Sequence, residues 1–123
     1  MASQTVLVVD DSAAVRRAVT LMASGAGYRC VEAADGAEAL KQMDAHDVDI
    51  VLTDLNMPVM DGRELIAKLR EQPKNRFIPI LVLTTECHDD VASELKRSGV
   101  TGVLQKPIGR DELLAALTRV ASA

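Results

Sequence analysis

The sequence predicts one α/β domain, residues 1–123, built around a five-stranded parallel sheet. Two observations lead to this fold class. Short apolar runs rich in β-branched residues recur five times along the chain, and segments with a helical spacing of apolar residues separate them. Alternation of strand and helix implies a parallel sheet covered on both faces, because each right-handed crossover lays a helix against the sheet. A length of 123 residues is typical of one domain with one sizeable core.

The predicted strands are short. They are TVLVV at 5–9, YRCVEA at 28–33, DIVLT at 49–53, IPILVLT at 78–84 and GVLQ at 102–105. The uninterrupted apolar residues of VLVV and ILVL favour strands that are buried on both faces.

The segments between the strands carry apolar residues at the i, i+3, i+4 and i+7 positions of a helix. The clearest are Val15, Ala18, Val19 and Met22; Leu113, Leu114, Leu117 and Val120 follow the closely similar spacing i, i+1, i+4 and i+7. Ser12 is suited to cap the first helix, which Gly25 and Gly27 can end, and Gly99 can end the fourth helix.

Composition and targeting signals exclude several classes of function. The chain has 14 basic and 18 acidic residues, no basic run and few aromatic residues, so direct binding to nucleic acid is not expected. The N-terminal MASQTVLVVDD lacks a signal-peptide pattern, and no apolar run reaches the ~18 residues of a membrane span. We therefore expect a cytoplasmic protein without a membrane segment, in which Cys30 and Cys87 are free thiols.

Polar side chains follow four of the five predicted strands. They are Asp10 and Asp11 after the first strand, Asp54 after the third, Thr84 and Thr85 at the fourth, and Lys106 after the fifth. In an open α/β sheet, ligands bind at the edge formed by the carboxyl ends of the strands. We call this edge the carboxyl edge and expect the functional site of the protein to lie there.

The residue types at this edge favour phosphoryl transfer. Three carboxylates in one crevice repel each other, so the site is expected to bind a cation or to keep one carboxyl neutral. Hard oxygen donors suit Mg²⁺ better than Zn²⁺. An aspartate is already an anion at neutral pH and can act as a nucleophile without a general base. Mg²⁺, the Lys106 ammonium and the Thr84 hydroxyl together suit the oxygens of a phosphoryl group.

Four motifs together resemble the receiver domain of two-component response regulators. They are Asp10-Asp11, the segment DLNMPVMDG at 54–62, the segment LTTE at 83–86, and Lys106-Pro107. The resemblance extends over essentially the whole chain. It implies a doubly wound, flavodoxin-like (βα)5 fold with strand order 2-1-3-4-5 and an aspartate that a histidine kinase phosphorylates.

The resemblance also implies roles for single residues. Asp54 is then the phosphoacceptor, and Mg²⁺ is bound by Asp11, Asp54 and the backbone carbonyl of Asn56, with Asp10 acting largely through water. Thr84 is the expected switch hydroxyl. Lys106 is the expected phosphate-contacting lysine, followed by a cis peptide bond to Pro107.

Within the family, the sequence is similar to the single-domain, chemotaxis-type (CheY-like) members. Asn56, Met57-Pro58 and Glu86 carry this similarity. It implies a monomer that signals by binding a downstream protein, and the surface at 88–109 is the expected contact. Val103 departs from the family pattern, which often has an aromatic residue or histidine three positions before the lysine.

Several of these residues have a simpler structural interpretation. Paired aspartates after a strand also favour a helix N-terminus, and Asp61-Gly62 is typical of a turn that starts a helix. Adjacent strand positions point oppositely, so Thr85 is a weaker site candidate than Thr84. His46 in a loop and His88 at the start of the fourth helix are expected on the surface.

Two other functions use the same residues. A phosphatase with an aspartate nucleophile needs an acid two positions later, where this chain has Asn56, which cannot donate and recover a proton. A phosphate sink or relay intermediate would accept phosphate without a target of its own, and the sequence leaves it open. Nucleotide binding is disfavoured, because neither GxxxxGK nor GxGxxG follows the first strand.

Overall fold

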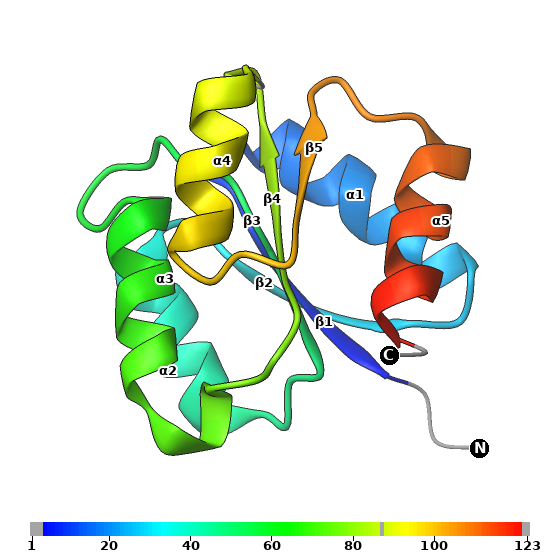
Figure 1. The fold of residues 1–123 in the computed structure, drawn as a ribbon. Coiled ribbons are helices and arrows are strands. Elements are labelled where there is room, and N and C mark those ends of the chain that lie inside the picture. Colours follow the sequence, from blue (N-terminus) through cyan, green and yellow to red (C-terminus); the bar gives the residue numbers. More distant parts are fainter. Residues whose placement is uncertain (1–3, 87, 122–123) are drawn as a thin grey trace.

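The computed structural model describes residues 4–86 and 88–121. Five parallel strands form one sheet in the order β2-β1-β3-β4-β5 (Figure 1). They are β1 (Thr5–Val9), β2 (Arg29–Ala33), β3 (Ile50–Thr53), β4 (Ile80–Thr84) and β5 (Gly102–Gln105). The predicted fold class and strand order are confirmed.

Helices cover both faces of the sheet. They are α1 (Ala13–Gly25), α2 (Gly36–Ala45), α3 (Gly62–Glu71), α4 (Asp89–Arg97) and α5 (Arg110–Ala121), with a 3₁₀ turn, η1 (Pro73–Asn75), before β4. Helices α1 and α5 lie on one face, and α2, α3 and α4 lie on the other (Figure 1). Each face has its own buried cluster of apolar side chains, and the residues of β1, β3 and β4 alternate between the two clusters.

The central strands are buried on both faces, as their apolar runs predict. The exposed fraction is at most 2% for Val6 to Val9 and at most 3% for Ile80 to Leu83. Three strands begin later than predicted: β2 at Arg29, β3 at Ile50 and β4 at Ile80, in place of positions 28, 49 and 78. The N–H of Tyr28 donates to the carbonyl of Ala23 and so closes the end of α1 instead of extending β2. Pro79 has no N–H to give to a ladder, and β4 begins at Ile80.

The helix ends follow the predicted signals. Ser12 caps α1 and accepts a hydrogen bond from the N–H of Val15 at 3.3 Å. Gly27 and Gly99 both have a φ of 98°, a conformation that favours glycine, just after α1 and α4. His88 precedes α4 as its N-cap residue without a capping hydrogen bond from its side chain.

Two further predictions concern membranes and thiols. None of the helices in the described part of the chain combines the length and apolar character that a bilayer crossing requires. Cys30 is a free thiol, and its burial, together with the charge of Glu32, raises the pKa of this thiol. Cys87 lies outside the described residues.

Candidate functional site

Three carboxylates meet at the carboxyl edge of the sheet. Asp10 and Asp11 follow β1, and Asp54 follows the neighbouring strand β3. A carboxylate oxygen from each of the three lies within 4.8 Å of the other two. Asp10 is 3% and Asp54 is 9% exposed, whereas Asp11 is exposed to solvent. The cluster therefore has a buried floor and one side open to water.

Lys106 places a positive charge against the two buried carboxylates. Its Nζ lies 2.7 Å from Oδ2 of Asp10 and 3.1 Å from Oδ2 of Asp54. Burial by itself would lower the pKa of this lysine, but the hydrogen bonds and charges of Asp10 and Asp54 outweigh burial and raise the pKa. Lys106 is therefore an ammonium at neutral pH and offsets part of the repulsion between the carboxylates.

Backbone N–H groups orient the other oxygens of the same carboxylates. Oδ1 of Asp54 accepts from the N–H of Leu55 at 2.8 Å, and Oδ1 of Asp10 accepts from the N–H of Ser12 at 2.9 Å. Both side chains are thus fixed through two oxygens, by a backbone donor and by Lys106. A carboxylate held in this way loses little conformational freedom when it reacts or binds a ligand.

The loop after Asp54 packs closely against α3. A Cβ atom at Gly62 would lie 2.2 Å from the backbone oxygen of Asp54, so this position has no room for a side chain. Asp61 caps α3 and accepts from the N–H of Glu64 at 2.9 Å. The interpretation of Asp61-Gly62 as a helix start is confirmed. The lack of a side chain at Gly62 also allows the backbone of Asp54 to lie close to the start of α3.

Thr84 ends β4 beside the cluster and is fully buried. Its hydroxyl oxygen accepts from the N–H of Glu86 at 3.1 Å, and its backbone oxygen accepts from the N–H of Lys106 at 2.9 Å. The hydroxyl proton of Thr84 remains able to donate. Thr85 is exposed, as the alternation of strand positions predicts.

A side-chain hydrogen bond links the loops that follow β3 and β4. The amide of Asn56 donates to Oε1 of Glu86 at 2.7 Å. The sequence analysis assigned the backbone carbonyl of Asn56 to the metal site and did not foresee this pairing of its side chain with Glu86. His46 and His88 are exposed, as expected.

Arg16 on α1 is a further residue that the sequence did not single out. Its Nη1 donates to the backbone oxygen of Asp10 at 2.7 Å, and its Nε donates to Oε1 of Glu32 on β2 at 3.0 Å. The only sequence signal is the position of a cation near the N-terminus of a helix, where the helix dipole disfavours it.

The donor atoms of the cluster fit a magnesium ion. They are carboxylate oxygens close enough to share one ion, and the open side at Asp11 leaves room for water. Mg²⁺ prefers oxygen ligands and keeps several waters, whereas structural Zn²⁺ sites use cysteine and histidine. No second group of acidic, histidine or cysteine side chains suited to a metal occurs within residues 4–86 and 88–121.

The chain matches the family model of the response regulator receiver domain over residues 6–118. The chain therefore belongs to the receiver family of two-component response regulators, whose CheY-like members are signalling switches. The peptide bond between Lys106 and Pro107 is cis, as the resemblance to the family implies.

Among relatives, the chain is 39% identical over 103 residues to the chemotaxis protein CheY1 of Helicobacter pylori, covering 82% of this chain and 83% of CheY1. It is 36% identical over 110 residues to the autoinducer sensor kinase/phosphatase CqsS of Vibrio cholerae, covering 89% of this chain but only 16% of CqsS. CheY-like proteins and receiver segments of longer sensor proteins are thus both similar to this chain.

Solved structures of similar proteins match the whole fold, as two examples illustrate. The chemotaxis protein CheY4 of Vibrio cholerae has a TM-score of 0.92 and 43% identity, covering 97% of this chain and 99% of that one. The receiver domain of the sensor histidine kinase PA1611 of Pseudomonas aeruginosa, described with a magnesium ion coordinated in its active-site cleft, has a TM-score of 0.90 and 30% identity, covering 99% of this chain and all of that one.

Proposed function

We propose that this chain is a phosphorylation switch. Asp54 accepts a phosphoryl group from the phosphohistidine of a histidine kinase, and the phosphorylated protein then binds a downstream target. The observation that carries the proposal is the position of Asp54, whose carboxylate lies 3.1 Å from the Lys106 ammonium and within 4.8 Å of carboxylate oxygens of Asp10 and Asp11. A nucleophile, a cation and a set of metal ligands therefore share one small site.

In the transfer step, a carboxylate oxygen of Asp54 attacks the phosphorus atom. The new oxygen–phosphorus bond forms as the phosphorus–nitrogen bond breaks, and the imidazole of the kinase histidine leaves with the electron pair. Because Asp54 reacts as an anion, the step needs no general base. Lys106, already within reach of Asp54, is placed to contact an oxygen of the incoming group.

The magnesium site proposed here consists of Asp11, Asp54 and the backbone carbonyl of Asn56, with Asp10 acting largely through water. When bound, Mg²⁺ supplies positive charge against the phosphoryl oxygens. The donor chemistry of the cluster and the magnesium ion described for the PA1611 receiver support this assignment.

Thr84 is the residue through which we propose that the state of Asp54 reaches the rest of the protein. Its buried hydroxyl can donate to a phosphoryl oxygen while its oxygen still accepts from the N–H of Glu86. A shift of Thr84 toward the phosphoryl group would therefore move the backbone of Glu86, which lies three residues before α4. This loop is the two-state element in the proposal.

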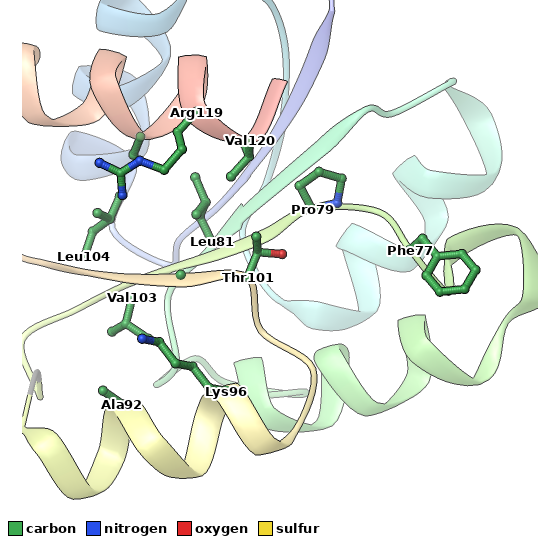
Figure 2. Close-up of a pocket in the computed structure, with 12 residues that line it drawn as sticks. Phe77, Pro79, Leu81, Ala92, Lys96, Thr101, Val103, Leu104, Arg119 and Val120 are labelled. Carbon is green, nitrogen blue, oxygen red and sulfur yellow. The ribbon is translucent and has the colours of Figure 1, made fainter. Parts of the chain in front are cut away.

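The proposed contact for the downstream target is the α4–β5 surface, residues 88–109. Val103 lies there, and Figure 2 shows its side chain directed toward Ala92 and Lys96 of α4. These residues line part of a cavity of about 470 Å³ between α4, β5 and α5. Because valine has no ring that could swing, we propose that the change spreads through the β4–α4 loop and α4 rather than through residue 103.

The rest of the proposal follows the CheY-like relatives. We propose a single-domain, monomeric protein of the cytoplasm with a role in chemotaxis. The main alternative is a phosphate sink or relay intermediate, which the similarity to receiver segments of sensor kinases favours. Capture of a non-kinase protein only by the beryllofluoride-activated form would argue against the sink. A phosphatase is the weaker alternative, because the Asn56 amide cannot act as a general acid that donates and recovers a proton during turnover.

Intact-mass spectrometry after incubation with acetyl phosphate tests the proposal. The wild-type protein should gain one phosphoryl group in Mg²⁺ and none in excess EDTA. Asp54→Asn should gain none under either condition, whereas Asp47→Asn, at an exposed loop position, should label like the wild type. Equal labelling of Asp54→Asn would remove Asp54 from the mechanism. If the wild type shows no adduct, beryllofluoride binding distinguishes rapid hydrolysis from an inert site.

A further inference from the structure

The peptide between Asp10 and Asp11 is fixed from outside the acidic cluster. Its carbonyl, which is that of Asp10, accepts from Nη1 of Arg16 at 2.7 Å, and in the preceding peptide the N–H of Asp10 donates to the carbonyl of Ala33 at 3.1 Å. The carbonyl of Asp10 is part of the peptide plane that leads into Asp11. The orientation of Asp11 therefore depends on what holds this carbonyl.

Arg16 is itself held in place by Glu32. Its Nε donates to Oε1 of Glu32 at 3.0 Å, and Glu32 lies on β2 opposite Val8 of β1. The side chains of Arg16 and Glu32 are 19% and 26% exposed, so the pair is mostly shielded from water. One guanidinium thus connects α1, β2 and the backbone at the end of β1.

The position of Arg16 in α1 has no explanation in helix stability. It lies four residues after the N-cap Ser12, close to the positive end of the helix dipole, and a cation there is disfavoured. The two hydrogen bonds account for an arginine at this position, because its planar fork can donate to a carbonyl and to a carboxylate at once.

We infer that Arg16 is a positioning residue for the metal site. By fixing the carbonyl of Asp10, it holds Asp11 in the orientation that a divalent cation needs. The inference rests on the proposed function and extends it by one residue outside the cluster of ligands. Groups that orient metal ligands from behind contribute about 10-fold or more to metal affinity.

Arg17 provides a matched control on the same helix. Its side chain is 71% exposed, and its Nε lies 3.7 Å from Oε2 of Glu32. Arg16→Met and Arg17→Met each remove one positive charge beside the same carboxylate, that of Glu32. Loss of a positive charge alone should tighten binding of Mg²⁺, so weaker binding by Arg16→Met has the sign opposite to a simple charge effect.

The test is titration of the metal-free proteins with Mg²⁺, followed by ¹H–¹⁵N NMR. Arg16→Met should bind Mg²⁺ about tenfold more weakly than the wild type, and Arg17→Met should bind as well as the wild type or better. In the absence of metal, the backbone order parameters of Asp11 and Ser12 should fall only in Arg16→Met. At saturating Mg²⁺, the labelling rate of Arg16→Met with acetyl phosphate should recover to near the wild-type value.

Arg16→Lys separates positioning from folding. A lysine keeps the charge, but its single ammonium cannot reproduce the fork, so binding of Mg²⁺ should lie between that of the wild type and that of Arg16→Met. Circular dichroism under the same conditions reports the folded fraction of each variant. Equal affinities in the folded Arg16→Met and Arg17→Met proteins would overturn the inference while leaving the proposed function intact. A wild-type protein that binds no Mg²⁺ would overturn both.

Discussion

The acidic site and the α4–β5 surface are packed in opposite ways. At the site, β3 is buried along its whole length, and Asp10 and Asp54 are each held by Lys106 and by a backbone N–H. At the α4–β5 surface, the apolar residues of β5 are only half-buried beside the cavity near Val103 (Figure 2). Charged groups are fixed where the proposed chemistry takes place, and space is left where the proposed output requires movement.

Gly62→Ala should cause the largest loss of stability, because it adds an atom to the tightly packed acidic site. The added Cβ would meet the backbone oxygen of Asp54 at 2.2 Å, and neither backbone segment can move without disturbing the site. We expect a loss of about 3 kcal/mol in the free energy of unfolding, measured with urea. Gly25→Ala is the control, because nothing lies within 4 Å of its added Cβ. A Gly62→Ala protein as stable as Gly25→Ala would contradict the packing described for this loop.

Two valines on neighbouring strands allow a direct comparison of packing in the sheet centre and at the α4–β5 surface. Val82 of β4 and Val103 of β5 are register partners, but Val82 is fully buried and Val103 lines the cavity. Val82→Phe should lower the free energy of unfolding by about 2 kcal/mol through overpacking. Val103→Phe should change it by less than about 1 kcal/mol, because the cavity offers space. Urea unfolding of both variants measures the difference, and equal losses would show that the α4–β5 surface is as tightly packed as the sheet centre.

Lys106→Met tests the cation of the site. Removing the ammonium leaves Asp10 and Asp54 without their shared partner, and we expect a loss of about 1 to 2 kcal/mol, since the site is partly open to solvent. Added Mg²⁺ should stabilise this variant more than the wild type, because it neutralises the same carboxylates. Thermal unfolding with and without Mg²⁺ measures both effects, and an identical response to Mg²⁺ would argue against this role of Lys106.

The stability that Lys106 contributes should decrease at high pH. The pKa of Lys106 in the folded protein is raised above its ordinary value of 10.5. The stabilisation by Lys106 is therefore complete below pH 10.5 and is lost as the pH rises through the higher folded pKa. The difference in stability between wild type and Lys106→Met should stay constant from neutral pH to about pH 10 and shrink above it. A difference that already falls between pH 6 and 9 would contradict the assignment.

The smallest effect of a substitution is expected at the ion pair between Arg63 of α3 and Glu94 of α4, and it is measured as a change in the pKa of Glu94. Nε and Nη2 of Arg63 donate to the two carboxylate oxygens of Glu94 at 2.9 and 3.3 Å. The hydrogen bond from Arg63 holds the pKa of Glu94 below its ordinary value of 4.5, so the pair contributes at neutral pH and is lost as the pH falls through the folded pKa. In a ¹³C NMR titration, Arg63→Gln should return the Glu94 pKa toward 4.5. An unchanged pKa would show that the pair does not persist in solution.

The fold and the acidic cluster were predictable from the sequence because their signals are local. The apolar runs predicted the strands, and a strand end fixes where Asp10, Asp54 and Thr84 lie in a parallel sheet. The roles of Arg16 and of the Asn56–Glu86 bond were not predictable in this way. Arg16 and Glu32 are 16 positions apart in the chain, and Asn56 and Glu86 are 30 positions apart. Whether two such side chains form a hydrogen bond depends on their rotamers, which the sequence pattern does not give.

The most direct measurement of the link between the site and the α4–β5 surface is ¹H–¹⁵N NMR with Mg²⁺ and beryllofluoride, a stable mimic of the phosphoryl group. In the wild type, the amides of Leu55 and Glu86 at the site should shift together with those of Ala92 and Val103. In Thr84→Val, which lacks the hydroxyl that links the site to the N–H of Glu86, the shift at Leu55 should remain and those at Glu86, Ala92 and Val103 should be lost. Shifts confined to the site loops in the wild type would contradict the proposal that phosphorylation of Asp54 reaches the α4–β5 surface.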